Sequence, residues 1–212
     1  MQQPILTAWH CDTLNQPFYQ FAQMKQFAPD SIETVKAHYR VAWADWKQFV
    51  QQVQAALQAS GLPIGATHIE RWCNGWQVRA HLFAFFKLTG HEHDAPILSL
   101  ILNRQNLIVS LDWHAYRAAK SNSTVGQYHG YLAQLAQANW RDWRIWRGKD
   151  SEYATHPLVG EKQPAHYSWR EGDDFYRIGK TLSRDELAQH DCVAWAAQHL
   201  QQLAQLYARC FD

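Results

Sequence analysis

A ten-residue segment, 140–149, combines two residue types that bind nucleic acids. Three of its residues are tryptophans, and four basic residues stand against the single acid Asp142. Basic side chains bind phosphates, and indole rings stack on bases. The segment therefore indicates a ligand or nucleic-acid surface made of Trp140, Arg141, Trp143, Arg144, Trp146, Arg147 and Lys149. The alternative is that the tryptophans belong to the core and the arginines cover it, and the formal net charge of +1 favours that alternative.

A second cluster of reactive side chains is the run His91-Glu92-His93-Asp94. Imidazole and carboxylate groups are common ligands of transition metals, so His91, His93 and Asp94 are candidate metal ligands. No matching pair of ligands is recognisable elsewhere in the chain, which contains 12 histidines. Chance clustering in a polar loop is therefore the favoured interpretation, and the sequence predicts no metal and no cofactor.

Asp112 and His114 stand two residues apart at the end of an apolar run. An aspartate that orients a histidine base is a common arrangement in hydrolases. No nucleophile motif, zinc-binding helix motif or glycine-rich phosphate loop accompanies the pair. The pair is the basis of an alternative function, a small metal-dependent hydrolase or nuclease, that would also use the 91–94 loop.

These residues depend for their positions on the stretch 67–113, where apolar runs alternate with turn residues. Asn74-Gly75 suits a type I′ turn, because both central residues of that turn need a positive φ. We therefore predict a hairpin between strands 69–72 and 76–87. Two further strands are predicted at the apolar run 97–102 and at the alternating run 107–113.

The predicted strand 76–87 has two unlike faces. Its even-numbered residues from Trp76 to Phe86 form the drier face, whereas the opposite face is polar at one end and carries Phe83 and Phe85 at the other. Aromatic rings on the outer face of a sheet indicate that the face is covered or binds a partner. Phe83 and Phe85 therefore join the candidate ligand or nucleic-acid surface.

Two long helices are predicted, one near each end of the chain. Apolar residues recur at steps of three and four from residue 30 to Gly61, after a capping box formed by Asp30 and Glu33. A second helix is predicted from the capping box of Ser183 and Glu186 to Phe211. Shorter helices are predicted over 17–27 and 124–137, strands over 140–149 and 175–178, and a long irregular loop over 151–172.

Length and composition limit the class of protein. A chain of 212 residues is long enough for one sizeable core, and we predict a single domain, 1–212, with 1–28 as a packing segment. The four cysteines have no metal-ligand spacing and indicate no disulfide framework. The chain has no signal-peptide pattern and no run of about 18 apolar residues, so the predicted location is cytoplasmic, without a membrane partner.

Several of these runs together resemble the amino-terminal DNA-recognition module of modification-dependent restriction systems. The runs are Trp72-x-x-x-Trp76, 83–87, 97–102, 107–112, Tyr176-Arg177-Ile178 and Leu206-Tyr207. The resemblance covers roughly residues 65–210 and implies recognition of DNA, with a modified base as one candidate target. It assigns no binding residue in this chain.

Together the patterns predict an α+β fold, in which an antiparallel sheet of about five or six strands packs against the two long helices. The leading functional prediction is a non-enzymatic module that binds nucleic acid or a small ligand. The alternatives are the hydrolase based on Asp112 and His114, and a structural homo-oligomer whose exposed aromatic side chains form an interface.

Overall fold

The computed structural model describes residues 5–161 and 167–212. The α-helices are α1 (Ala8–Thr13), α2 (Phe21–Phe27), α3 (Ile32–Ala59), α4 (Val125–Tyr128) and α5 (Cys192–Tyr207). The strands are β1 (Ile64–Ile69), β2 (His81–Leu88), β3 (Pro96–Asn103), β4 (Asn106–Trp113), β5 (Arg144–Arg147) and β6 (Tyr176–Ser183). The 3-10 turns are η1 (Pro29–Ser31), η2 (Ala115–Lys120), η3 (His129–Ala136), η4 (Ala138–Trp140), η5 (Val159–Glu161), η7 (Leu187–Gln189) and η8 (Ala208–Cys210).

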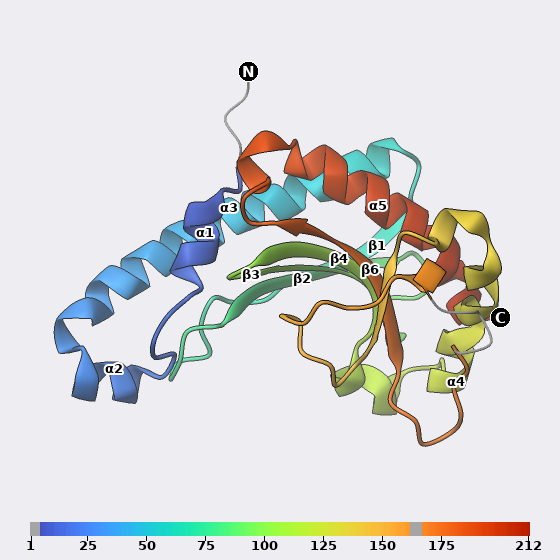
Figure 1. Ribbon diagram of the computed structural model, residues 1–212, viewed down its shortest axis with the longest axis horizontal. Coiled ribbons are helices and arrows are strands. Elements are labelled where there is room, and N and C mark those ends of the chain that lie inside the picture. Colours follow the sequence, from blue (N-terminus) through green and yellow to red (C-terminus); the bar gives the residue numbers. More distant parts are fainter. Residues whose placement is uncertain (1–4, 162–166) are drawn as a thin grey trace.

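The strands form one six-stranded sheet in the order β1-β2-β3-β4-β6-β5, and every neighbouring pair is antiparallel. The first four strands are neighbours in both sequence and space. Figure 1 shows α3 and α5 on one side of the curved sheet, with η2 and the orange segment that follows β5, about residues 150–157, on the other. The predicted α+β fold, with a long helix near each end of the chain, is therefore confirmed.

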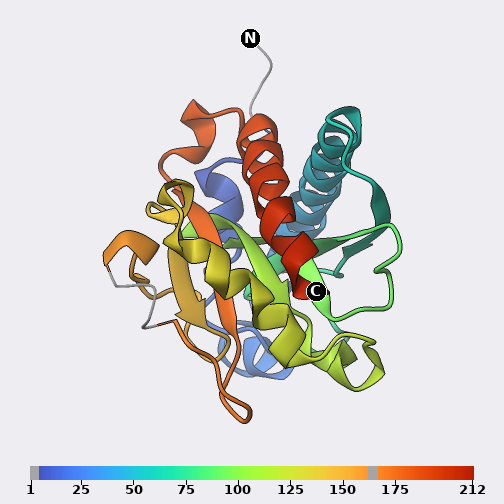
Figure 2. The same ribbon diagram turned by 90° about the vertical axis from the view of Figure 1, so that its right-hand side faces the viewer.

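The main core lies between the sheet and the two long helices, which pack side by side (Figure 2). Alternate residues of the central strands point towards the helices and are fully buried, including Leu82, Leu100 and Val109. Burial of one such side chain contributes about 1.5–3 kcal/mol, so this layer supplies most of the driving force for folding. No helix within the described residues is long and apolar enough to cross a membrane.

Helix α3 follows the predicted periodicity, and its buried residues fall on the stripe that faces the sheet. It ends where Gly61 adopts a φ of 85°, and the N–H of Leu62 donates to the carbonyl of Leu57. The predicted capping box does not form. Residues 29–31 form the turn η1 instead, and the Glu33 carboxylate accepts a hydrogen bond from Lys36 at 2.9 Å.

Strands β1 and β2 pair as a hairpin, but the predicted first strand, 69–72, overlaps β1 only at Ile69, and the type I′ turn predicted at Asn74-Gly75 is wrong. Gly75 has a φ of 94°, whereas Asn74 does not have a positive φ and instead accepts hydrogen bonds at its side-chain oxygen from the N–H groups of Trp76 and Gln77. The turn sits at the tip of an arm, 70–80, that pairs with the start of α2 through a bridge between Gln20 and Gln77. Contact with a distant helix therefore overrides the local turn preference.

Other helices and strands also begin or end at residues that differ from the prediction. The Ser183–Glu186 contact forms, but the final helix begins only at Cys192, where the Asp191 carboxylate accepts from two backbone N–H groups at 3.0 Å. The predicted helix 124–137 is one α-turn followed by η3, since two glycines weaken it. Strand β6 is longer than predicted, β5 is shorter, and α1 was not predicted. Part of the predicted loop, 162–166, lies outside the described residues.

Candidate ligand-binding cavity

A cavity of about 520 Å³ lies on the open face of the sheet, opposite α3 and α5. Its walls come from segments that are far apart in the sequence: the strands β1 to β4 and β6, the residues that follow β4, and Glu152 from the long loop. Cavities of this size suit small ligands. We call it the open-face cavity.

Phe83, Phe85 and Ile101 line an apolar part of this cavity. Antiparallel pairing places Phe83 opposite Ile101 and Phe85 opposite His68 in the neighbouring strand. The two phenyl rings are 5.8 Å apart, and the imidazole of His68 stacks on Phe85 with a centroid distance of 5.0 Å. Phe83 and Phe85, predicted from the sequence as surface rings, therefore line the cavity.

Two ion pairs and one contact between a histidine and a carboxylate surround this apolar part. Nε of Arg177 donates to Asp112 at 2.7 Å, Arg79 donates to Glu70 at 2.6 Å, and His81 lies 3.1 Å from the Glu152 carboxylate. Each of the three carboxylates therefore has a nitrogen group within hydrogen-bond distance. Its polar wall offers both hydrogen-bond donors and acceptors.

Burial and hydrogen bonding to basic groups have opposite effects on the pKa values of the two enclosed acids, Asp112 and Glu152. Burial raises the pKa of Asp112, although the Arg177 guanidinium and the N–H of Trp113 act against the rise. Burial also acts to raise the pKa of Glu152, but the contact with His81 and the hydrogen bonds of Tyr153 and Asn103 together outweigh it and lower that pKa. The ion pairs therefore hold the polar wall in place only because their geometry offsets the cost of desolvation.

His114 supplies a neutral imidazole at the same cavity. Burial lowers its pKa, and the nearby positive charges of Lys87 and Arg117 lower it further. Its Nδ1 is buried without a hydrogen-bond partner among the described residues. The ring also lies 5.0 Å from that of Phe85. An imidazole in this state is able to donate or accept one further hydrogen bond.

Asp112 and His114 share the open face but do not form the dyad expected from the sequence. Oδ1 of Asp112 accepts from Arg177 and from the Trp113 N–H, both at 2.7 Å. No hydrogen bond joins Asp112 to His114 within the part of the chain that the structure describes. The arginine competes successfully for the carboxylate because its charge compensates a buried acid better than a neutral imidazole does.

A second hollow, of about 510 Å³, adjoins the open-face cavity and shares His68, Phe85 and His114 with it. This hollow is mainly basic, since Lys87, Arg117 and Lys120 line it with the single acid Glu92. The Lys87 ammonium donates to the carbonyls of Glu92 and Asp94. The other two basic side chains are on exposed residues. We call this neighbour the basic hollow.

The Trp/Arg segment is mainly core. Trp140 and Trp143 are 2% exposed and belong to the main core, and Trp146 is 6% exposed and packs with Phe83 in a small cluster on the open face. The rings of Trp140 and Trp143 are enclosed and have no free face on which a base can stack. The burial of Trp140 and Trp143 favours the alternative, in which they belong to the core, whereas Trp146 lines a hollow together with Arg144.

The basic residues of this segment have separate positions. Arg144 donates to the carbonyl of His156 and Arg147 to that of Asp174, each at 2.6 Å. These guanidinium groups hold the long loop against the sheet. Arg141 and Lys149 are exposed, but they flank a buried segment rather than a row of accessible rings.

The predicted metal ligands are also occupied in other ways. His91 lies 3.0 Å from Oδ2 of Asp94 and stacks on Phe211 at 3.6 Å, while Asp94 is buried and accepts from the Asn122 N–H. His93 is exposed. Among the described residues, no group of three His, Cys, Asp or Glu side chains is arranged to hold a metal ion. The residues of the 91–94 loop therefore do not fit a metal site.

Sequence reasoning missed several members of the open-face cavity, notably His68, Glu152 and Arg177. Alternation along strand 76–87 already placed His81 on the same face as Phe83 and Phe85. A comparable signal for Arg177 exists in β6, but it needs the strand register, which pairs Leu111 with Ile178. Glu152 lies in a loop and has no periodic signal.

The chain has relatives along almost its whole length. A protein-family model matches residues 6–210. An "Uncharacterized protein" of Haemophilus influenzae is 45% identical over 205 residues, which cover 97% of this chain and 98% of the relative. The match includes both long helices, the whole sheet and the open-face cavity. The chain therefore belongs to this uncharacterised protein family.

Proposed function

We propose that the protein is a binding module that holds a planar, uncharged heterocycle in the open-face cavity, with a nucleobase as the ligand class. The observation that carries the proposal is the half-buried ring of Phe83, beside the buried ring of Phe85, at a cavity whose carboxylates are each paired and whose wall offers donors and acceptors. Aromatic side chains stack on bases, and polar groups read the edges of the base.

The basic hollow supports a nucleotide rather than a bare base. Lys87, Arg117 and Lys120 lie next to the aromatic part of the cavity, because His68, Phe85 and His114 line both spaces. A base against Phe83 would leave its phosphate towards the two exposed cations, Arg117 and Lys120, which bind phosphates by charge. The base could come from a free nucleotide or from a strand of DNA, as the resemblance to DNA-recognition modules implies.

Calorimetric titration with nucleosides, mononucleotides and short single- and double-stranded oligonucleotides, with and without a methylated cytosine, tests the proposal. We expect saturable binding that Phe83→Leu weakens about tenfold, since loss of stacking costs about 1–3 kcal/mol per base. The matched control is Phe27→Leu, which changes an exposed ring outside the cavity. Equal effects of the two substitutions, or no saturable binding to any member of the panel, would overturn the proposal.

A second set of variants tests whether the cations bind the phosphate, and the choice of ligand shows whether the base belongs to a nucleotide or to a nucleic acid. Arg117→Gln combined with Lys120→Gln should weaken oligonucleotides and nucleotides and reduce the salt dependence of binding, while leaving uncharged nucleosides unaffected. Arg170→Gln, at an exposed position outside both spaces, is the control. If only oligonucleotides bind, the ligand is nucleic acid; if mononucleotides bind equally well, it is the free nucleotide.

A further inference from the structure

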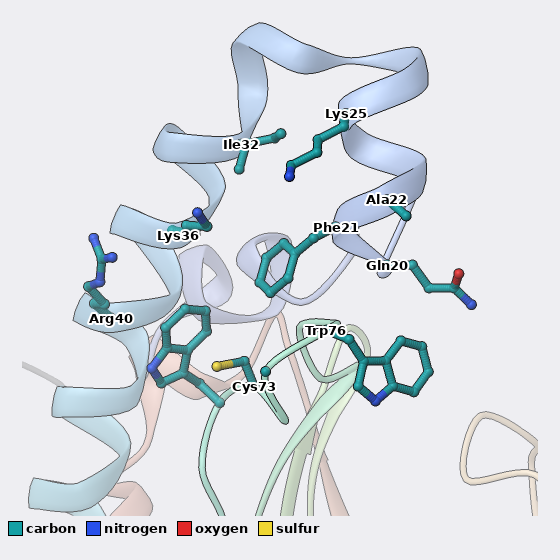
Figure 3. A pocket seen from close by; sticks show the side chains of 11 residues that line it. Gln20, Phe21, Ala22, Lys25, Ile32, Lys36, Arg40, Cys73 and Trp76 are labelled. Atoms are coloured by element: carbon teal, nitrogen blue, oxygen red, sulfur yellow. The ribbon is translucent and has the colours of Figure 1, made fainter.

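A separate groove of about 520 Å³ lies where the tip of the arm between β1 and β2 meets α2 and α3. Figure 3 shows it between α2, the first half of α3 and the tip of the 70–80 arm. None of its lining residues lines the open-face cavity or the basic hollow. We call it the α2 groove.

Backbone hydrogen bonds hold the two sides of this groove together. The N–H of Phe21 donates to the carbonyl of Trp76, and the N–H of Val78 donates to that of Tyr19, both at 3.0 Å. The rings of Phe18 and Phe27 stack at 5.3 Å across α2. The short helix is therefore attached to the arm, and the groove has a defined shape before any ligand arrives.

The walls of the groove are aromatic. Phe21, Trp72 and Trp76 line it, with Ile32 of α3. Trp72 is backed by Tyr39 at 6.0 Å, whereas Trp76 remains 55% exposed. A large exposed indole beside a groove is an unusual cost for a soluble protein, and Trp is enriched where rings contact partners. The groove therefore offers flat apolar surface to a ligand.

The charged side chains that line the α2 groove are all positive. Lys25, Lys36 and Arg40 line it, and Figure 3 shows them around the upper and left sides of the space. Glu33 is the acid beside them: it pairs with Lys36 at 2.9 Å. Neither Lys25 nor Arg40 makes an ion pair with any residue that the structure describes. This contrasts with the open-face cavity, where each acid has its base.

We propose that the α2 groove binds a small aromatic anion, a planar ring that carries a carboxylate, phosphate or sulfonate. The ring would lie against Trp72 and Trp76, and the anionic group would face Lys25 and Arg40. Charge complementarity selects an anion over a neutral ring, and the aromatic walls select a planar body over a simple inorganic anion. The inference does not depend on the function proposed for the open-face cavity.

Fluorine NMR of protein labelled with 5-fluorotryptophan tests this site directly. Naphthalene-1-sulfonate and the uncharged naphthalene-1-sulfonamide serve as a matched pair of probes, and Trp76→Phe identifies the Trp76 resonance. We expect the sulfonate to shift that resonance with a saturable dependence on concentration. We expect the sulfonamide to bind at least about tenfold more weakly, as the loss of a charge-assisted contact predicts.

Two double variants test which cations contact the sulfonate. Lys25→Gln with Arg40→Gln should weaken the sulfonate about tenfold and leave the sulfonamide nearly unchanged. Lys149→Gln with Arg170→Gln removes two exposed cations elsewhere and should leave both unchanged. Phe83→Leu should also have no effect. The proposal is overturned if the Trp76 resonance does not move, if the two probes bind alike, or if Phe83→Leu abolishes the binding.

Discussion

At the scale of single residues, His129 is a buried histidine with both ring nitrogens engaged. Its Nδ1 donates to the carbonyl of Val125 at 2.7 Å, and its Nε2 accepts from the N–H of Tyr176 at 3.0 Å. The second contact needs an unprotonated nitrogen, so the folded protein requires the neutral ring. Burial lowers the pKa of His129 to about 4, from an ordinary value of 6.5.

Because the pKa of His129 is lowered, we expect the protein to lose stability in acid. Between pH 6.5 and about 4 the unfolded chain binds the proton and the folded protein does not, so the free energy of unfolding falls as the pH falls through this window. The contribution amounts to about 3 kcal/mol at its limit. Urea unfolding of the wild type and of His129→Gln from pH 7 to 4.5 measures it.

The variant should be less stable at pH 7 and should lose less stability on acidification, because glutamine does not titrate. Carboxylates affect both proteins alike and cancel in the comparison. Parallel stability curves for the two proteins would show that His129 is not responsible for the pH dependence.

At the scale of elements, the stretch from η4 to β5 shows how one segment serves two sides of the sheet. Trp140, Trp143 and Ile145 enter the main core, whereas Trp146 packs on the open face. The indole of Trp143 lies 5.3 Å from that of Trp140 and 5.7 Å from the ring of His199 on α5. The segment thus packs between the edge of the sheet and the last helix. This packing accounts for its tryptophans without a ligand.

Substitution within this segment should distinguish core from surface. Trp143→Ala should lower the free energy of unfolding by about 3–5 kcal/mol, because it removes a large ring from a close-packed site. Arg141→Ala, two residues away and exposed, should change it by less than about 0.5 kcal/mol. Urea unfolding checks both. If the two substitutions cost the same, the packing described for Trp143 is wrong.

At the scale of the whole molecule, the two faces of the sheet have different roles. One face is sealed by α3 and α5, and the other is only partly covered, by η2 and the long loop, which leaves the open-face cavity. The large exposed rings are Trp9, Phe27, Trp76 and Tyr116, and they come from four separate segments of the chain. A homo-oligomer with an aromatic interface therefore stays a prediction.

This arrangement predicts a gradient of local stability across the sheet. Strands β3 and β4 have a partner on each side and are buried almost throughout, whereas β1 and β5 are the edges. Their amide hydrogens should therefore exchange at least about tenfold more slowly than those of β1 and β5, because they open only in global unfolding. Hydrogen exchange followed by NMR measures this order, and slowest exchange at either edge strand would contradict it.

The sequence by itself determined the α+β class, the long helix α3 and the strands β3 and β4. These elements follow from the periodicity of apolar residues along the chain, which is a local property. It also placed Phe83 and Phe85 on the outer face of β2, because alternation in a strand needs no knowledge of the partners.

Only the tertiary structure decided which tryptophans are enclosed and which polar groups meet. Trp143 is buried because α5 and Lys180 pack against it, and Arg177 reaches Asp112 because β6 lies beside β4. Such contacts depend on strand order and on packing between residues far apart in the chain, and a sequence pattern shorter than those separations does not specify them. The paired carboxylates of the open-face cavity and the cations of the α2 groove come together in the same way.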